Sequence, residues 1–447
     1  MERLFCKRFV LALVIVASML FTSTTALAAG ICITEKSVKG LGNAFAGGAA
    51  VAEDASTIYF NPAGLTRLSG SQVQAGAHVI MTSFKFDNEG STTVLTQPLT
   101  GGDGGDGGDA HFVPNFFYSQ DISDRLKVGI GIISPFGLGT EYNDNWVGRY
   151  HTIKSEILTV DINPTIAYKI NSELSIGFGF SAQYMDAELT NNIDFGTIDA
   201  ASGGFFGLTP QGDDGYVKLE GDDWGYGFNL GMLFEPTEKT RIGLAYRSRI
   251  RYELEGDADF STPAAAALLA ENVLHLVNTD IEADVDMPDS VSLSVYHQLN
   301  DEWAIMADIT WTNWSVLDEL RIKFDSGAND SVTTFNWEDT LRYSIGATFT
   351  PNSKWTFRTG ISFDETPVPD AQHRTPRVPD EDRIWLALGT SYQFNDRMGF
   401  DVGYTYIFAD EAEIDKTAAG EDLLRGALKG EFEGSSNIIS AQFNWKF

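Results

Sequence analysis

The sequence contains few cysteines and no hydrophobic run long enough for a membrane-spanning helix. Of its 447 residues only Cys6 and Cys32 are cysteines, and the one extended apolar stretch covers residues 9–21. That stretch is shorter than the ~20 residues that a transmembrane helix requires. With a single cysteine beyond it, no internal disulfide can form in the rest of the chain.

Positive charge is scarce as well. The chain has 31 Lys and Arg against 62 Asp and Glu, which gives a formal net charge of −31. Such an excess repels the phosphate backbone of nucleic acids, so we expect no nucleic acid partner. The motifs G-x-S-x-G, H-E-x-x-H and C-x-x-C are missing, and the six histidines are scattered. We therefore predict no catalytic residues, no metal ligands and no cofactor, and we do not expect an enzyme.

The N-terminal stretch has the pattern of a secretory signal peptide. Arg3, Lys7 and Arg8 precede the apolar run, and a small-x-small site ends at Ala28. We predict a signal peptide over residues 1–28. A membrane anchor is the alternative, which the short apolar run disfavours.

Alternation between apolar and polar residues recurs along the chain. The last residues, 437–447 (NIISAQFNWKF), alternate strictly, and residues 126–132, 174–181, 224–231 and 355–363 do the same. Such alternation predicts β-strands with one apolar face. Because glycine and polar residues dominate the other face, the pattern fits the interior of a membrane barrel better than the core of a soluble sandwich.

The connections between these strands fall into two classes. Short polar turns lie at 121–125, 171–173, 236–239, 300–302, 351–354 and 395–397. Long acidic loops are predicted near 85–110, 136–157, 186–222, 255–283, 314–331, 364–382 and 409–435. This alternation is typical of bacterial outer-membrane barrels. We predict an all-β fold over residues 70–447, a transmembrane antiparallel β-barrel of about 14 strands in contact with outer-membrane lipid. Its last strand ends at Phe447, which we expect the barrel assembly machinery to recognise.

Residues 29–69 break the strand pattern. The segment is rich in glycine, including Gly40 and Gly42, which permit close approach of the backbone to a barrel wall. Pro62 would begin or break a helical turn. We predict that this segment forms a plug in the lumen, or hatch, with a free periplasmic tail as the alternative.

The sequence resembles the FadL-type outer-membrane transporters of long-chain fatty acids and hydrophobic compounds. The resemblance rests on "GLGNAFAGGAAVAEDASTIYFNPAGLTRL", which includes Asn61-Pro62-Ala63, and on the later blocks "WTFRTGISFDETPVPDAQHR" and "VPDEDRIWLALGTSYQFN". It implies a plugged fourteen-stranded barrel in the outer membrane of a Gram-negative bacterium, expected to act as a monomer. It also implies that ligand is captured by extracellular loops, passes to a luminal pocket and leaves sideways when the hatch shifts. Ile31 lies where the family places a residue beside the pocket, so we assign it to the gate.

Two loops are candidates for ligand capture. Residues 263–277 predict an amphipathic helix with Leu268, Leu269 and Leu276 available to one side. The preceding loop carries Phe205, Phe206 and Leu208. In the family a groove between these loops receives the ligand first; the alternative is that the residues only pack the loops together.

Basic side chains are predicted on the luminal face. Strand parity places there Arg247, Arg249, Arg251, Arg342, Arg358 and Arg383. A guanidinium could hold a fatty-acid carboxylate with two hydrogen bonds. Alternatively, these arginines neutralise luminal acids and tie the hatch to the wall.

The substrate remains open between two classes at this point. Glu338 stands where the fatty-acid transporters carry a basic residue, which leaves room for a neutral aromatic hydrocarbon such as toluene. A diffusion porin is a further alternative, and the hatch-like segment disfavours it. The stretch "GGDGGDGGDA" at 101–110 could bind calcium, although one copy is more typical of a flexible acidic loop.

Overall fold

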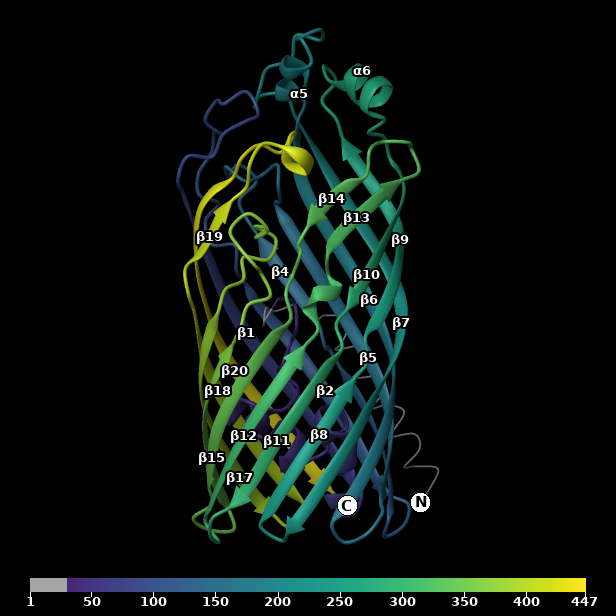
Figure 1. The fold of residues 1–447 in the computed structure, drawn as a ribbon, viewed down its shortest axis with the longest axis vertical. Coiled ribbons are helices and arrows are strands. Elements are labelled where there is room, and N and C mark those ends of the chain that lie inside the picture. The colour runs from purple at the N-terminus through teal and green to yellow at the C-terminus, as the bar shows by residue number, and fades with distance from the viewer. Residues whose placement is uncertain (1–29) are drawn as a thin grey trace.

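The computed structural model describes residues 30–447, so the predicted signal peptide lies outside the described residues. These residues form one tall closed barrel with short turns at the lower end and long loops at the upper end (Figure 1). Within residues 30–447 no helix combines the length and the apolar character needed to cross a membrane.

The wall consists of fourteen antiparallel strands, as the alternation predicts. In chain order they are β1 (Gln72–Asn88), β2 (Ala110–Asp121), β3 (Leu126–Ile133), β5 (Lys154–Lys169), β6 (Leu174–Asp194), β7 (Asp214–Thr237), β8 (Thr240–Arg247), β11 (Ser290–Gln298), β12 (Trp303–Thr312), β15 (Thr340–Phe349), β16 (Trp355–Asp364), β17 (Arg383–Asn395), β18 (Met398–Ala409) and β20 (Lys429–Lys446). All six predicted short turns join neighbouring strands of this wall.

Pairing between the first and last strands closes the barrel. The register between β1 and β20 runs from Gln72↔Lys446 to Asn88↔Gly430 without interruption. Ser71 and Phe447 extend it with backbone hydrogen bonds in both directions, at 2.9 and 3.2 Å. The alternating C-terminal stretch is therefore the strand that closes the sheet into a barrel.

The outer surface of the wall is apolar, as expected for contact with lipid. Large side chains that remain exposed there include Phe178, Leu230, Ile305, Ile345 and Leu386. Exposing this many large apolar side chains would be costly in water and is ordinary in a bilayer.

Six further strands continue the wall above the membrane band. They are β4 (Gly137–Glu141), β9 (Ile250–Ser261), β10 (Thr279–Met287), β13 (Glu319–Phe324), β14 (Ser331–Thr334) and β19 (Ala412–Asp415). Much of the sequence predicted as irregular loop is therefore strand, notably within 136–157, 186–222 and 255–283.

Cross-strand ion pairs explain why these acidic stretches can form a sheet. Glu156, Glu188 and Glu220 lie side by side on β5, β6 and β7. Lys154 bridges Glu156 and Glu188 at 2.7 and 2.9 Å, and Lys218 bridges Glu188 and Glu220 at 3.3 and 2.5 Å. The lysines offset the repulsion that a row of like charges would otherwise cause.

A break between β8 and β9 corrects the predicted orientation of one arginine. The side chain of Arg251 is 77% exposed and pairs with Asp286, whereas Ile250 is buried in the core. Two residues outside the strands, Ser248 and Arg249, separate β8 from β9. Odd-numbered residues such as Arg247 face inward on β8, but after this break the odd-numbered residue Arg251 faces outward on β9.

Short helical turns account for the remaining regular structure. They are α2 (Val38–Gly42), α3 (Gly48–Val51), α4 (Thr57–Phe60), η1 (Pro62–Arg67), α5 (Phe195–Ala201), α6 (Ala267–Leu269), the π-helical η2 (Ala270–Leu274), η3 (Trp314–Val316) and η4 (Gly420–Asp422). The first four lie inside the lower half of the barrel (Figure 1). The helix predicted over 263–277 is shorter than expected and covers 267–274.

Candidate functional site: the luminal segment and two cavities

Residues 30–69, which we call the hatch segment, are anchored to the wall through Asn61. This side chain is fully buried and donates from Nδ2 to the carbonyl oxygens of Ala49 at 2.6 Å and Met232 at 3.0 Å. Its Oδ1 accepts from the backbone N–H of Ala63 at 3.1 Å, and Pro62 occupies the first position of η1. One asparagine therefore caps a helical turn and joins the hatch segment to β7.

Glycines on both sides allow the hatch segment to touch the wall directly. A Cβ on Gly42 would lie 2.8 Å from the Cα of Gly389 on β17. A Cβ on Gly231 of β7 would lie 2.0 Å from Asn61 Oδ1, and one on Gly243 of β8 would lie 2.0 Å from the Ala49 carbonyl oxygen. The glycine-rich inner face seen in the sequence is therefore the surface that receives the hatch segment. Gly40 plays a different part, because its space is taken by the ring of Phe45 within the hatch segment itself.

The start of the hatch segment pairs with an interruption in the wall. Between β3 and β4 the chain leaves the sheet at Ser134, Pro135 and Phe136. Ile33 N donates to the Pro135 carbonyl and Gly137 N donates to the Ile31 carbonyl, both at 2.9 Å. Among the described pairings, residues 110–115 of β2 contact β1 alone and have no partner on the β3 side.

An apolar cavity of about 850 Å³ lies above this point, among β6, β7, β9, β10 and β13. We call it the upper cavity. Its lining includes Ile31, Met185, Leu254, Val285 and Trp337. Its lining suits a hydrophobic ligand, which gains ~25 cal/mol for each Å² of apolar surface removed from water.

A second cavity of about 900 Å³, the lower cavity, lies beneath the first and has a mixed lining. Cys32, Tyr59, Trp314, Arg342 and Asp364 contribute to it. The N-terminal residues separate the two spaces, since Ile31 lines the upper cavity and Cys32 the lower one. The indole rings of Trp314 and Trp337 meet edge to face at 5.1 Å beside Gly30 and complete the partition.

Five of the six arginines predicted on the luminal face are paired with carboxylates of the protein, among them Arg247, Arg358 and Arg383. Arg247 pairs with Asp161 at 3.3 Å and lies 4.0 Å from the ring centre of Tyr59 in the hatch segment. Arg358 pairs with Glu53 of the hatch segment at 3.0 Å.

Arg383 and Arg342 lie nearer the partition. Arg383 pairs with Asp380 at 2.9 Å and Asp364 at 3.5 Å, and Asp380 accepts from Gly30 N. Arg342 lines the lower cavity together with Asp364. The contacts of Arg247, Arg358 and Arg383 are those expected of side chains that neutralise acids and hold the hatch segment.

The two loops predicted for ligand capture meet at the upper end of the barrel, where α5 and α6 lie close together (Figure 1). Leu208, Leu269 and Leu276 pack in one cluster with Phe195 and Ile198, so they join the loops. The side chains of Phe205, Phe206 and Leu268 remain exposed, Phe205 to 84% and Leu268 to 65%.

The Gly/Asp-rich loop at 101–110 uses one of its carboxylates internally. Asp106 accepts hydrogen bonds from Ser83 Oγ at 2.7 Å and from the backbone N–H groups of Phe84 and Gly108 at 2.8 and 3.1 Å. Within residues 30–447 no group of three or more metal-binding side chains comes together.

A closed outer-membrane barrel, filled by its own N-terminal segment and enclosing an apolar cavity, defines a plugged transporter of hydrophobic compounds. The family model described as "Outer membrane protein transport protein (OMPP1/FadL/TodX)" matches residues 19–447, and the chain belongs to that family.

Relatives and solved structures agree with this assignment. The chain is 31% identical to the long-chain fatty acid transport protein of Escherichia coli O6:H1, over 95% of this chain and 96% of that protein. It is 29% identical to outer membrane protein P1 of Haemophilus influenzae, over 87% and 88% of the two chains. The crystal structure of a Pseudomonas aeruginosa FadL homologue superposes with a TM-score of 0.86 at 25% identity, covering 94% and 100% of the chains. The toluene transporter TodX of Pseudomonas putida shares the fold, with a TM-score of 0.66 at 19% identity over 88% and 94%.

Proposed function

We propose that this protein imports long-chain fatty acids or similar hydrophobic molecules, which the extracellular loops capture and pass to the upper cavity. The observation that carries the proposal is the apolar lining of that cavity, closed below by Ile31. The exposed side chains of Phe205, Phe206 and Leu268 offer an apolar first contact at the loop tips. The fatty acid transport proteins among its relatives support the same substrate class.

We further propose that ligand leaves the barrel sideways at the interruption between β3 and β4. The unpaired upper part of β2 supports this exit, because no sheet hydrogen bonds would have to break there. The hatch segment contacts this point through only two backbone hydrogen bonds, those of Ile33 and Gly137. A small shift of residues 30–33 would therefore open both the partition and the wall.

A reversible cross-link tests this route. Cys32 and Phe136 face each other as a pair flanked by those two hydrogen bonds, a geometry in which the Cα atoms are about 4.5 Å apart and a disulfide can form. We expect the Phe136→Cys variant, once oxidation has bridged the introduced thiol to Cys32, to lose uptake of labelled oleate and to regain it with a reductant. Cells lacking their own transporter of this type would supply the background.

The matched control is the double variant Cys32→Ser with Phe136→Cys, which has the same cavity but cannot form the bridge. Equal uptake by oxidised and reduced protein would contradict the proposed movement. Labelled toluene is supplied in parallel, and uptake of toluene without oleate would make the protein an importer of aromatic hydrocarbons instead.

A further inference from the structure

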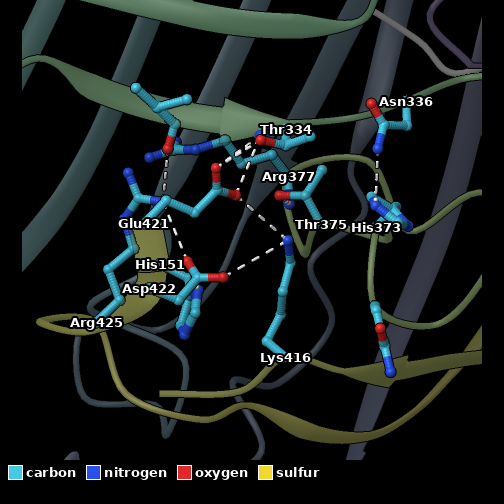
Figure 2. A network of polar contacts seen from close by, with 12 residues as sticks. His151, Thr334, Asn336, His373, Thr375, Arg377, Lys416, Glu421, Asp422 and Arg425 are labelled. Carbon is cyan, nitrogen blue, oxygen red and sulfur yellow. Dashed lines mark hydrogen bonds and ion pairs between the residues drawn. The ribbon is translucent and has the colours of Figure 1, made fainter. Parts of the chain in front are cut away.

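The loop between β16 and β17 spans the barrel mouth and reaches the opposite wall. Its residues 376 and 377 accept hydrogen bonds through their backbone carbonyls from Tyr142 Oη at 2.8 Å and from Thr140 Oγ1 at 3.1 Å. Arg377 thereby comes to lie beside β5 and β6, far around the wall from the strands that carry its loop. Figure 2 shows it beside the polar network of the upper loops.

The guanidinium of Arg377 bonds only to neutral groups. Its Nη1 donates to Thr152 Oγ1 at 3.0 Å, Ser155 Oγ at 2.9 Å and the Lys154 carbonyl at 3.3 Å. Its Nη2 donates to Asn191 Oδ1 at 3.2 Å. Among residues 30–447, no carboxylate lies within 4.0 Å of it, in contrast to Arg247, Arg358 and Arg383.

This positive charge is therefore not balanced by the protein. Burial is the main influence on the pKa of Arg377 and lowers it, and the guanidinium of Arg425 lowers the pKa further. Arg425 has its own partner in Asp422 at 3.1 Å. Charges in protein interiors are normally paired, because an uncompensated one loses its hydration without an equivalent gain.

Arg377 also belongs to the lining of the upper cavity. The other charged residue in that lining is Glu220, whose carboxylate pairs with Lys218 at 2.5 Å. The surface of the cavity is almost entirely apolar, so an arginine with an unbalanced charge lies in the wall of a hydrophobic space.

We propose that Arg377 is the anion-recognition residue of the upper cavity and selects an amphiphile with a carboxylate head and an apolar tail. A guanidinium binds a carboxylate through two parallel hydrogen bonds, and the ligand would supply the missing negative charge. The inference rests on the proposed function and narrows it to fatty acids rather than neutral hydrocarbons. Of the arginines singled out from strand parity, Arg342 also lines a cavity without a carboxylate within 4.0 Å among residues 30–447, but that is the lower cavity, whose lining includes the acid Asp364.

Binding of two ligands that differ only in charge tests the inference. The probes are 9,10-dibromostearate and its methyl ester, and the signal is quenching of tryptophan fluorescence, since Trp337 lines the cavity. The purified full-length protein is used at fixed detergent concentration. We expect Arg377→Gln to weaken binding of the acid about tenfold to hundredfold and to change binding of the ester less than about twofold.

Two further variants separate recognition from loop anchoring. Arg377→Lys keeps the charge but not the planar fork, and we expect an affinity for the acid between those of the native protein and Arg377→Gln. Arg374 lies in the same loop but is paired with Glu381, so Arg374→Gln disturbs the loop without removing the unbalanced charge. We expect any loss caused by Arg374→Gln to affect acid and ester alike.

Two outcomes would overturn the inference in distinguishable ways. Equal loss of acid and ester in Arg377→Gln would mean that Arg377 only fastens the loop, while the proposed transport function stands. Failure of the native protein to bind either probe would overturn the proposed function and the inference together.

Discussion

Asn61 shows how much of the hatch can depend on one side chain. This side chain has no exposed surface, and all of its hydrogen bonds go to backbone groups, two of them as donor and one as acceptor. Backbone carbonyl and N–H groups are the same whatever side chain a residue carries. The contact between Asn61 and β7 therefore tolerates substitutions of the neighbouring residues. Gly231 provides the space opposite, which no other residue could do without displacing Asn61.

Replacing Asn61 should loosen the hatch segment without unfolding the barrel. In Asn61→Ala, the carbonyls of Ala49 and Met232 lose their side-chain donor, at a cost of ~1–3 kcal/mol for a buried group left unpaired. We expect faster amide hydrogen exchange over residues 48–64 and unchanged exchange in β1 and β20.

The variant Asn61→Asp separates the two roles of this residue, capping η1 and donating hydrogen bonds to the carbonyls of Ala49 and Met232. The aspartate keeps the acceptor that caps η1 but has no Nδ2 donor for the two carbonyls. We expect exchange over 48–64 to rise at least as much as in Asn61→Ala. Native-like exchange in Asn61→Asp would show that the cap alone secures the segment.

At the scale of elements, the upper loops are held together by a compact polar network around η4 (Figure 2). Lys416 lies within 3.7 Å of Glu421 and 3.6 Å of Asp422, and Glu421 accepts from Thr334 in β14. His151 contacts Asp422 at 3.6 Å through Nδ1 and the Gly426 carbonyl at 3.1 Å through Nε2. The loop before β20 is thereby joined to the loop between β4 and β5.

Acid should release this junction. Burial lowers the pKa of His151 from 6.5 to about 4, against the opposing effect of Asp422. Because an opened loop would bind the proton near pH 6.5 and the closed loop only near pH 4, the stabilisation is complete above pH 6.5. The stabilisation is lost as pH falls toward 4. Over this range the equilibrium constant for loop opening rises by at most about tenfold per pH unit.

Amide hydrogen exchange of residues 416–428, measured at pH 7 and pH 4.5, checks this expectation. His151→Asn removes the titrating group and is the matched control, so its exchange should show only the intrinsic dependence on pH. The same extra opening at low pH in the native protein and in His151→Asn would assign the effect to the neighbouring carboxylates instead.

At the scale of the whole molecule, the net negative charge of the protein repels a negatively charged ligand. The chain carries −31, whereas the inferred ligand is an anion that must approach through acidic loops. Such repulsion reaches ~30 Å at 0.01 M salt and only ~8 Å at 0.15 M. Arg377 lies inside the barrel, where the negative charge of the outer surface repels the ligand less strongly.

Salt should therefore speed the capture of a fatty acid. Between about 10 and 150 mM salt we expect the association rate of oleate with the purified protein to rise several-fold, with no change for an uncharged ester of the same chain. Stopped-flow fluorescence provides the measurement. An association rate that falls with salt would indicate a locally positive entrance, which the acidic loops do not suggest.

Most of the architecture follows from local patterns. Period-two alternation, short turns and the position of Pro62 are properties of neighbouring residues, and they predict the strand number, the turns and the outer-membrane location. They fail where the pattern is interrupted, as between β8 and β9, where a short break reverses which face Arg251 occupies. They also underestimate strand length in the acidic stretches, because the lysines that stabilise those strands act across the sheet rather than along the chain.

Tertiary contacts, rather than local sequence, determine which arginine is the candidate for ligand binding. The sequence by itself places glycines and most of the predicted arginines on the inner face, but it cannot tell an arginine with a carboxylate partner from one without. That difference depends on residues far apart in the chain, such as Arg358 with Glu53, or Arg377 with Asn191. Charge balance in a barrel lumen is set by what the closed wall and the hatch segment bring together in space, and only the folded structure supplies it.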